Sequence, residues 1–424
     1  MAKALTRLGT FGALAIAGVV LTLSGFSGCA SREVIPATDP GQRPSFDSRR
    51  VAEGARLAAA GNCLACHTVP GGKPYAGGAP VKTPFGIVYG TNITPDPDTG
   101  IGAWPEEAFV RAMREGIDRE GRHLYPAFPY DHFTLLTDED LGALYAYVMT
   151  RDAVRAENKP ATVPIPRPLL AGWNALFLQK GPYHPDPSKD RQWNRGAYLV
   201  EGLAHCGACH TPRNAAGAEN RREAFSGGEA EDWHAPALNA ASPSPVPWTA
   251  DALHTYLRTG IAEDHALTAG PMADVVRNLS RAPDEDLRAM AAYVATLDKR
   301  SAEARATKPP QPQEAKSEAE RRGKVVYAGA CGDCHDRGRE AEGGALPLQL
   351  AIGLAIPTAS NLAHIVHEGI VPADGEAAPW MPSYAGALTE DQLADLLDYL
   401  RAMAGKPPWK DSRSAAHKVA AKKP

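Results

Sequence analysis

The segment Cys63-Leu64-Ala65-Cys66-His67 has two further versions in this chain of 424 residues. They are Cys206-Gly207-Ala208-Cys209-His210 and Cys331-Gly332-Asp333-Cys334-His335. Cys-x-x-Cys-His is the attachment spacing of c-type haem. Two thiols three positions apart lie one helical turn apart, so both can form thioethers to the haem, and the next histidine faces the iron. The motifs therefore predict three haem c groups, with His67, His210 and His335 as proximal ligands.

Other uses of such cysteines fit the sequence less well. One Cys-x-x-Cys-His could be half of a zinc site or a redox dithiol. Zinc needs further pairs of ligands, and the one remaining cysteine, Cys29, cannot supply them. A disulfide framework would leave the histidine after each pair unexplained. Haem attachment is the interpretation that accounts for all three motifs.

A longer internal repeat surrounds the motifs. After each motif, a predicted helix ends in Gly-Ile, at Gly116, Gly260 and Gly369. A second predicted helix follows, with carboxylates in its first turn that suit the helix dipole. It carries a leucine and, six residues later, a tyrosine, at Leu141/Tyr147, Leu287/Tyr293 and Leu393/Tyr399. We therefore expect an all-α protein of three tandem cytochrome c-like domains, each wrapped around its covalently bound haem.

The residue twelve positions after each Gly-Ile glycine is the candidate sixth ligand of the haem iron. It is Met272 in the second repeat and Met381 in the third, each beside a proline in a predicted loop. A methionine in such a loop is a poor candidate for a helix core, and we expect both to bind iron through their thioethers.

The first repeat breaks this pattern, because its aligned residue is Phe128, which has no donor atom for iron. His132, four residues further on, is the first candidate for the ligand, and His123 is the second. Met113 and Met149 fit helices better. A five-coordinate haem, open to small ligands, is the remaining alternative.

Composition and spacing give the domain boundaries. Proline-rich residues 156–190 form a semi-rigid linker, and residues 301–317 form a charged, flexible one. The basic residues 406–424 are expected to be a disordered tail. The expected domains are an export signal at 1–29, then cytochrome c domains at 48–155, 191–300 and 318–405.

The N-terminus resembles an export signal, with Lys3 and Arg7 before an apolar stretch. It ends in Phe26-Ser27-Gly28-Cys29, which is similar to a bacterial lipoprotein box and makes Cys29 a candidate for lipidation. Cleavage nearby, or retention of the segment as a membrane anchor, are the alternatives. All three place the chain on the periplasmic side of the cytoplasmic membrane. A formal charge of -4, from 45 Lys+Arg against 49 Asp+Glu, disfavours a nucleic-acid partner.

The repeat order, together with three sequence segments, resembles the cytochrome c subunits of bacterial membrane-associated dehydrogenases. The segments are Thr91-Asn92-Ile93-Thr94-Pro95-Asp96, Leu124-Tyr125-Pro126-Ala127 and residues 202–214. Such subunits serve quinoprotein alcohol dehydrogenases, flavin-dependent gluconate and fructose dehydrogenases, and molybdenum hydroxylases of the aldehyde, isoquinoline and nicotinate type. The alcohol dehydrogenase type usually has methionine where this chain has Phe128, which looks more like the molybdenum-hydroxylase group.

The resemblance implies that a separate catalytic subunit oxidises the substrate, and that electrons pass through three haems to ubiquinone or another respiratory acceptor. No flavin or nicotinamide fingerprint is present, so we expect no catalytic domain in this chain. Two other functions compete with this one. The chain could be a haem enzyme or gas-binding cytochrome that uses an open first haem, or a freestanding electron carrier.

Overall fold

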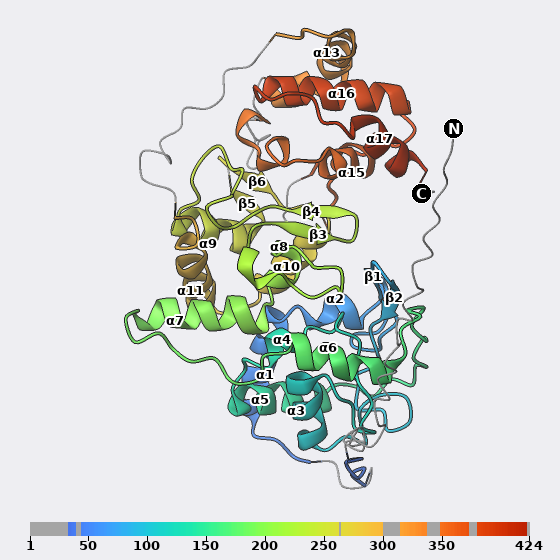
Figure 1. Ribbon diagram of the computed structural model, residues 1–424, viewed down its shortest axis with the longest axis vertical. Coiled ribbons are helices and arrows are strands. Elements are labelled where there is room, and N and C mark those ends of the chain that lie inside the picture. Colours follow the sequence, from blue (N-terminus) through green and yellow to red (C-terminus); the bar gives the residue numbers. More distant parts are fainter. Residues whose placement is uncertain are drawn as a thin grey trace, which may run out of the picture. The chain divides into compact units, whose positions relative to one another are not determined.

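A computed structural model describes residues 33–39, 44–262, 264–299, 314–336, 348–372 and 380–421 (Figure 1). The predicted export signal, Cys29 and most of the linker at 301–317 lie outside these residues. We refer to residues 48–155 as module 1, 191–299 as module 2 and 318–421 as module 3. None of the helices in the described ranges is long and apolar enough to cross a membrane.

Module 1 begins with α1 (Ser48–Ala60) and ends with α5 (Asp138–Met149). Between them lie α2 (Cys63–His67), the hairpin of β1 (Pro80–Thr83) and β2 (Gly86–Tyr89), α3 (Glu106–Glu115) and α4 (Tyr130–Phe133). The two strands are antiparallel, with Val81 opposite Val88.

Module 2 repeats this order with insertions. It begins with α7 (Arg191–Ala197) and the π-helix η3 (Tyr198–Leu203) and ends with α11 (Asp284–Ala295). The elements between them are α8 (Gly207–His210), η4 (Arg221–Glu223), β3 (Gly228–Ala230), β4 (Trp233–Ala235), α9 (Ala250–Thr259), β5 (Ile261–Ala262), β6 (Ala266–Leu267) and α10 (Pro271–Leu279). Strands β3 and β4 form one antiparallel pair, and β5 and β6 form another.

Module 3 has no strand among its described residues. It consists of α13 (Glu318–Ala330), α14 (Gly332–His335), η5 (Leu348–Leu350), η6 (Ile352–Leu354), α15 (Ser360–Glu368), α16 (Glu390–Met403) and α17 (Ser412–Ala420). The chain is thus mainly helical, as predicted, but the hairpins of modules 1 and 2 were not expected.

Each module pairs its first helix with the helix that carries the tyrosine. The pairs are α1 with α5, α7 with α11, and α13 with α16. In each pair a glycine stands where the helices cross, at Gly54, Gly196 and Gly323. A Cβ atom on these glycines would lie 1.9, 2.0 and 2.0 Å from the carbonyl oxygens of Ala143, Ala289 and Asp395. Only glycine allows so close a crossing.

The start of each tyrosine-bearing helix follows the sequence prediction. The first turns of α5, α11 and α16 carry Asp138-Glu139-Asp140, Asp284-Glu285-Asp286 and Glu390-Asp391. Thr137 and Thr389 cap α5 and α16, accepting hydrogen bonds from the backbone N–H groups of Asp140 and Gln392. These caps satisfy backbone donors that a helix start leaves unpaired.

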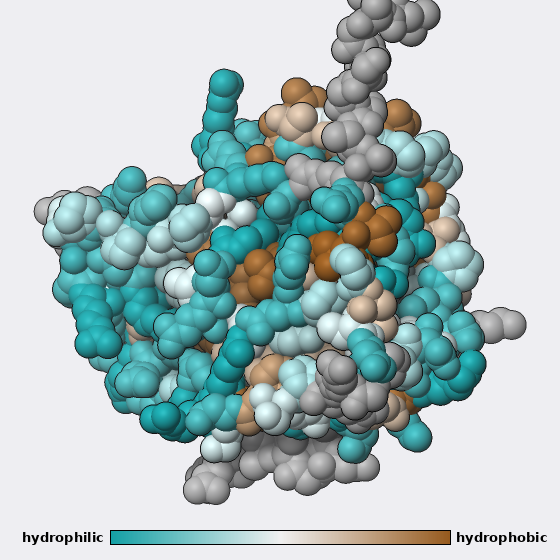
Figure 2. All heavy atoms as spheres, turned by 90° about the horizontal axis from the view of Figure 1, so that it is seen from below, coloured by the Kyte–Doolittle hydropathy of each residue, from teal (hydrophilic) through white to brown (hydrophobic). Residues whose placement is uncertain are grey.

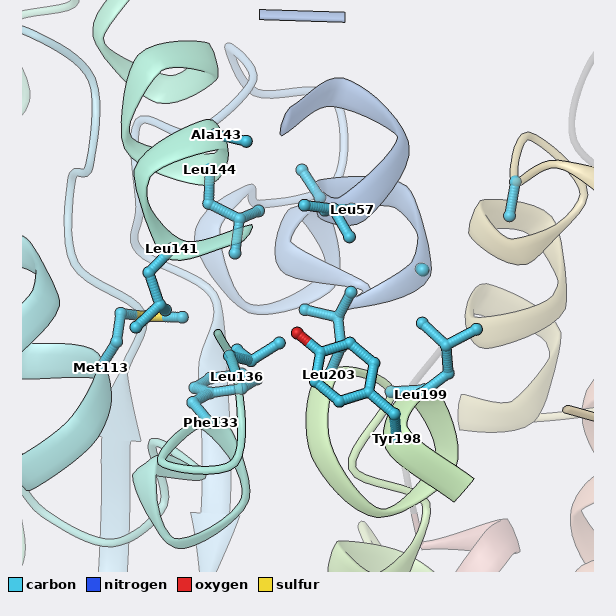
Figure 3. Packing of buried hydrophobic residues seen from close by; sticks show 14 of the residues in the cluster. Leu57, Met113, Phe133, Leu136, Leu141, Ala143, Leu144, Tyr198, Leu199 and Leu203 are labelled. Carbon is cyan, nitrogen blue, oxygen red and sulfur yellow. The ribbon is translucent and has the colours of Figure 1, made fainter. Parts of the chain in front are cut away.

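Modules 1 and 2 share one hydrophobic core. Figure 3 shows Leu57 of α1, Leu144 of α5 and Leu203 of η3 side by side within this cluster. Module 3 has a separate core, built around Leu396, Leu397 and Ala363. Modules 1 and 2 are therefore one packed body, although their sequences are repeats.

The C-terminal residues correct the prediction of a disordered tail at 406–424. Residues 412–420 form α17, which buries Ala416 and Val419 against the other helices of module 3. Trp409 is also buried, and its indole N–H donates to the Ile356 carbonyl at 2.8 Å. The prediction was wrong because it relied on the Lys- and Ala-rich composition of the tail. The order of these residues forms an amphipathic helix, and its apolar face completes the core of module 3.

The expected linker at 156–190 contains helices and contacts module 1. It contains η2 (Arg167–Leu169) and α6 (Leu170–Phe177). Near its start, the Asn158 side chain accepts a hydrogen bond from the Asn92 N–H at 2.7 Å and donates to the Thr99 carbonyl at 2.9 Å. The connector therefore lies against module 1 and does not hang free.

Candidate haem-attachment site

Each Cys-x-x-Cys-His motif lies on or beside a short helix, α2, α8 or α14. The six cysteines of these motifs are free thiols, with no disulfide among them. All six thiols are therefore available for bonding to a prosthetic group, as the haem interpretation requires.

Burial raises the pKa of the Cys63 and Cys206 thiols to about 12 and that of the Cys331 thiol to about 11. A reactive redox dithiol needs the opposite, a pKa lowered by nearby positive charge. The electrostatics of these thiols thus favour the neutral form and disfavour a redox dithiol.

The histidines of the first two motifs are oriented by the backbone. Nδ1 of His67 lies 2.7 Å from the Thr91 carbonyl oxygen, and Nδ1 of His210 lies 2.7 Å from that of Pro236. Since a carbonyl only accepts, Nδ1 must carry the proton, which leaves the Nε2 lone pair to bind iron. Burial lowers the pKa of both imidazoles, which favours this neutral form.

Glycines hold the backbone close to the same two motifs. The N–H groups of Gly77 and Gly227 each donate to the carbonyl of the motif histidine, at 2.8 Å. A Cβ on Gly90 would lie 1.7 Å from the Cys66 carbonyl oxygen, and a Cβ on Gly228 would lie 2.5 Å from that of Cys209.

Sequence reasoning missed these glycines. A Gly-Gly pair after the motif could have indicated three of them, because Gly77 belongs to Gly77-Gly78 and the other two form Gly227-Gly228. A third pair, Gly343-Gly344, follows the third motif but lies outside the described residues.

The candidate sixth ligands occupy different local structures. Met272 is not in a loop as expected, but in the first turn of α10. Met381 exchanges two backbone hydrogen bonds with Ile370, both 2.9 Å long. Both methionines are half-buried and pack against the cores. Phe128 also packs against the core of module 1, with its ring 5.4 Å from that of Phe133.

The expected role of His132 as a ligand of the first haem stays a prediction, and the structure gives both of its ring nitrogens other partners. Its Nδ1 lies 2.5 Å from the Glu201 carbonyl oxygen, and its Nε2 lies 2.6 Å from a carboxylate oxygen of Glu219. Both ring nitrogens thus have an acceptor in module 2, and iron would have to replace one of them. The sequence could not show this, because Glu219 is 87 residues away.

The other first-haem candidates are also placed. His123 is half-buried, and its Nδ1 lies 3.4 Å from the side-chain nitrogen of Asn174 in the connector. Met113 and Met149 are buried in the shared core, as their helical pattern indicated.

His132 belongs to a buried polar cluster between modules 1 and 2. Burial lowers the pKa of His132, but the hydrogen bond and charge of Glu219 outweigh it and raise the pKa to about 9. His205, whose ring centre is 6.4 Å from that of His132, has its pKa lowered to about 4 by burial and by the charge of His132. One histidine of this pair is therefore charged and the other neutral at pH 7.

The attachment motifs of modules 1 and 2 approach each other. The residues just before them, Asn62 and His205, both have left-handed backbone, with φ of 52° and 39°. The Asn278 amide of α10 donates to the Asn62 side chain, and His205 Nε2 lies 3.4 Å from the Gly61 carbonyl oxygen. The contacts between these flanking residues keep the two attachment motifs close to each other. Electron exchange between two prosthetic groups requires such a short distance.

Module 3 contacts module 2 beside the second motif. The Asn361 side chain accepts from the His234 N–H at 2.8 Å and donates to the His234 carbonyl at 2.9 Å. The rings of Trp233 and His364 stack with centres 4.9 Å apart. These residues of β4 immediately precede Pro236, whose carbonyl orients His210.

Taken together, the helix pairs, free thiols and backbone-oriented histidines define a c-type cytochrome with covalently bound haem. The family model for cytochrome c matches residues 51–152. The model for subunit III of cbb3-type cytochrome c oxidase matches residues 318–400.

Comparison with curated proteins gives the family. The gluconate 2-dehydrogenase cytochrome c subunit of Pantoea cypripedii is 36% identical over 84% of this chain and 86% of its own length. The fructose dehydrogenase cytochrome subunit of Gluconobacter japonicus is 33% identical over 95% of this chain and 88% of its own. This chain therefore belongs to the family of cytochrome c subunits of bacterial dehydrogenases, and its role is electron transfer.

One of the subunits of nicotinate dehydrogenase from Pseudomonas putida is more similar in sequence, at 45% identity over 92% of this chain. The chain spans only 33% of the length of that protein. The similarity therefore concerns one part of that longer relative.

Proposed function

We propose that this chain holds three haem c groups in three tandem cytochrome c domains, one in each module. The observation that carries this proposal is the repeated helix pair, with its crossing glycine at Gly54, Gly196 and Gly323. Each of these glycines precedes a Cys-x-x-Cys-His motif by ten residues or fewer. Module 2 shares the pair and the oriented histidine with module 1, which supports counting it as a third domain.

The proposed attachment residues are the six motif cysteines, and the proposed proximal ligands are His67, His210 and His335. Met272 and Met381 are the proposed sixth ligands in modules 2 and 3. Two histidine–thioether haems would transfer electrons without exchanging ligands.

The proposed electron path runs from a catalytic dehydrogenase subunit, through the three haems, to ubiquinone or another respiratory acceptor. The names of the relatives support the dehydrogenase partner, since they are subunits of gluconate, fructose and nicotinate dehydrogenases. The predicted export signal supports a location on the periplasmic side of the cytoplasmic membrane.

The haem count can be tested by a pyridine haemochrome assay on the full chain, produced in a host that matures c-type cytochromes. Three haems per chain are expected, and two after Cys331→Ala with Cys334→Ala. A count of two in the unaltered chain would refute the proposal that all three modules carry haem. The matched change Cys29→Ser is expected to leave the count at three.

The electron path can be tested by adding substrate to membranes that contain the partner dehydrogenase. All haems that the chain carries should become reduced, and reoxidation should follow addition of a quinone. Failure of substrate to reduce the cytochrome in the intact complex would contradict this function.

A second function is favoured by one observation in module 1. Phe128 has no donor atom, and His132 uses both ring nitrogens elsewhere. An open first haem would bind small ligands such as carbon monoxide. Magnetic circular dichroism distinguishes the two possibilities: three low-spin haems would eliminate the open site, and a high-spin component that shifts with carbon monoxide would establish it.

A further inference from the structure

The helix α6 turns an apolar face to solvent. Leu176 and Leu169, just before the helix, are 77% and 66% exposed. They are seven positions apart, two helical turns, and so share a face with Gly172, where an added Cβ would meet nothing within 4 Å. The remaining exposed residues between 168 and 178 are Pro168, Ala171 and Ala175. A single exposed leucine is ordinary on a protein surface. A helix face on which every exposed residue is apolar usually marks a contact site.

The opposite side of α6 is fastened to the protein. The Asn174 side chain accepts from the Tyr130 hydroxyl at 2.7 Å and donates to the Glu115 carbonyl at 2.9 Å. The Trp173 indole N–H donates to the Ala216 carbonyl at 3.0 Å, and Leu170 is buried. These bonds hold the helix against modules 1 and 2, so the orientation of its outer face is fixed.

The stretch of chain that carries this face has no acidic residue of its own. No Asp or Glu occurs from Asn158 to Pro185, although the chain has 49 of them in total. Arg167 and Lys180 stand on either side of the helix, and Lys180 is paired with Glu115 at 2.8 Å. A helix with an apolar face and flanking cations is typical of segments that lie in the interface of an anionic membrane.

A further partly exposed apolar side chain lies near the fastened side of α6. Phe85, at the turn between β1 and β2, is partly exposed, and its ring lies 2.9 Å from where a Cβ of Gly217 would be. Gly217 is next to Ala216, which binds Trp173 of α6. The molecule as seen in Figure 2 is largely hydrophilic, with a band of hydrophobic side chains across it.

We propose that α6 rests on the surface of the phospholipid bilayer, with Leu169 and Leu176 inserted among the lipids. This proposal rests on the proposed periplasmic, membrane-associated location. A protein partner fits the face less well, because protein interfaces are centred on aromatic and arginine side chains. Here the aromatic residues Trp173 and Phe177 are half-buried and pack on each other, 5.4 Å apart, while leucine, alanine and glycine face outward.

The test is a photo-crosslink from the full haem-loaded chain in its native membranes. Leu176→p-benzoylphenylalanine is expected to give an adduct with the mass of a phospholipid. The matched control is Val325→p-benzoylphenylalanine on α13, at a site that is 73% exposed and should give no lipid adduct. Haem content and substrate-driven reduction of both variants are measured alongside, so that loss of folding or of the electron path is recognised separately.

An adduct from position 176 to a dehydrogenase subunit would overturn the proposal in favour of a protein interface, and the absence of any adduct would overturn it as well. The role of the flanking cations is tested on purified chain added to vesicles. Lipid crosslinking from position 176 should be several-fold stronger with phosphatidylglycerol in the vesicles than with phosphatidylcholine alone. Equal yields would contradict the role of the flanking cations.

Discussion

His132 joins module 1 to module 2 through both of its ring nitrogens. Its two hydrogen bonds, to Glu201 and Glu219, hold it in the charged form. Asp131, Arg213 and Arg221 are other charged groups near this pair, and neutral His205 packs beside it. The pH dependence of this interface should therefore follow the titration of His132.

We expect the free energy of unfolding to fall as pH rises from 6.5 through about 9. The folded-state pKa of His132, about 9, is above its ordinary value of 6.5, so its contribution is complete below pH 6.5 and is lost above pH 9. The loss should be on the order of 1–3 kcal/mol. Thermal unfolding of the haem-loaded chain at several pH values measures it.

His132→Gln should remove most of this pH dependence and lower stability at pH 6.5. The control is His417→Gln, because His417 lies on the exposed face of α17 and pairs with Glu390. If His132→Gln kept the same slope between pH 6.5 and 9, another group would be responsible.

At the scale of the element, α13 contains both a crossing glycine and an open one. A Cβ on Gly323 would lie 2.0 Å from the Asp395 carbonyl oxygen, whereas a Cβ on Gly329 would meet nothing within 4 Å. We expect Gly323→Ala to destabilise module 3 by about 1–3 kcal/mol, because α13 and α16 must move apart. Gly329→Ala should stabilise it by about 0.5–1 kcal/mol. Denaturant unfolding measures the free energy of unfolding of both variants. Similar effects of the two changes would contradict the close crossing of α13 and α16 at Gly323.

The helix α17 gives a second prediction at this scale. Trp409, which leads into α17, is only 6% exposed, and the Arg401 guanidinium lies 4.5 Å from the centre of its ring. Trp409→Ala should cost about 3–5 kcal/mol, as for other buried aromatic residues. Lys410→Ala, at the exposed next position, is the control. An unchanged melting temperature for Trp409→Ala would mean that the tail adds nothing to the core.

The elements also show what the sequence could and could not predict. Acidic helix starts and the Leu/Tyr spacing predicted α5, α11 and α16, because these signals are local. The crossing glycines were missed because they precede the first cysteine by nine, ten and eight residues in the three modules. In module 2 the π-helix η3 accommodates the longer spacing, since a π-bulge inserts a residue without ending the helix. A search for equal spacing cannot find such positions.

At the scale of the whole molecule, module 3 is attached to module 2 by the Trp233–His364 stack, by a hydrogen bond from the Ile352 N–H to the His265 carbonyl at 2.9 Å, and by two polar side chains of α15. The Asn361 side chain forms two hydrogen bonds with the backbone of His234, and the Ser360 hydroxyl donates to the Asp232 carbonyl at 2.9 Å. Asn361→Leu should weaken this attachment by about 1–3 kcal/mol, since it removes both bonds at once.

The expected readout is an earlier, separate unfolding transition of module 3 and slower electron exchange between modules 2 and 3. Asn361→Asp should have an intermediate effect, because a carboxylate still accepts from the His234 N–H but cannot donate to its carbonyl. A single unchanged transition in Asn361→Leu would show that other contacts hold the modules together.

Contacts between modules were the part of the molecule that the sequence did not reveal. The motifs predicted where haem is attached, because the two thiols and the histidine are adjacent in the chain. The partners of His132, Asn62 and Asn361 are 69 to 216 residues away, and no local pattern marks them. Their positions follow from how the repeats pack and not from the repeat itself.

The shared core of modules 1 and 2 limits how this chain can be divided. Separating module 1 from module 2 would expose Leu57 and Leu144 on one side and Leu199 and Leu203 on the other, all of which are buried in one cluster. Module 3 has its own core and follows a linker. A gene fusion, a deletion or a natural rearrangement should therefore keep the first two modules as an indivisible pair, while the third can be lost, replaced or moved.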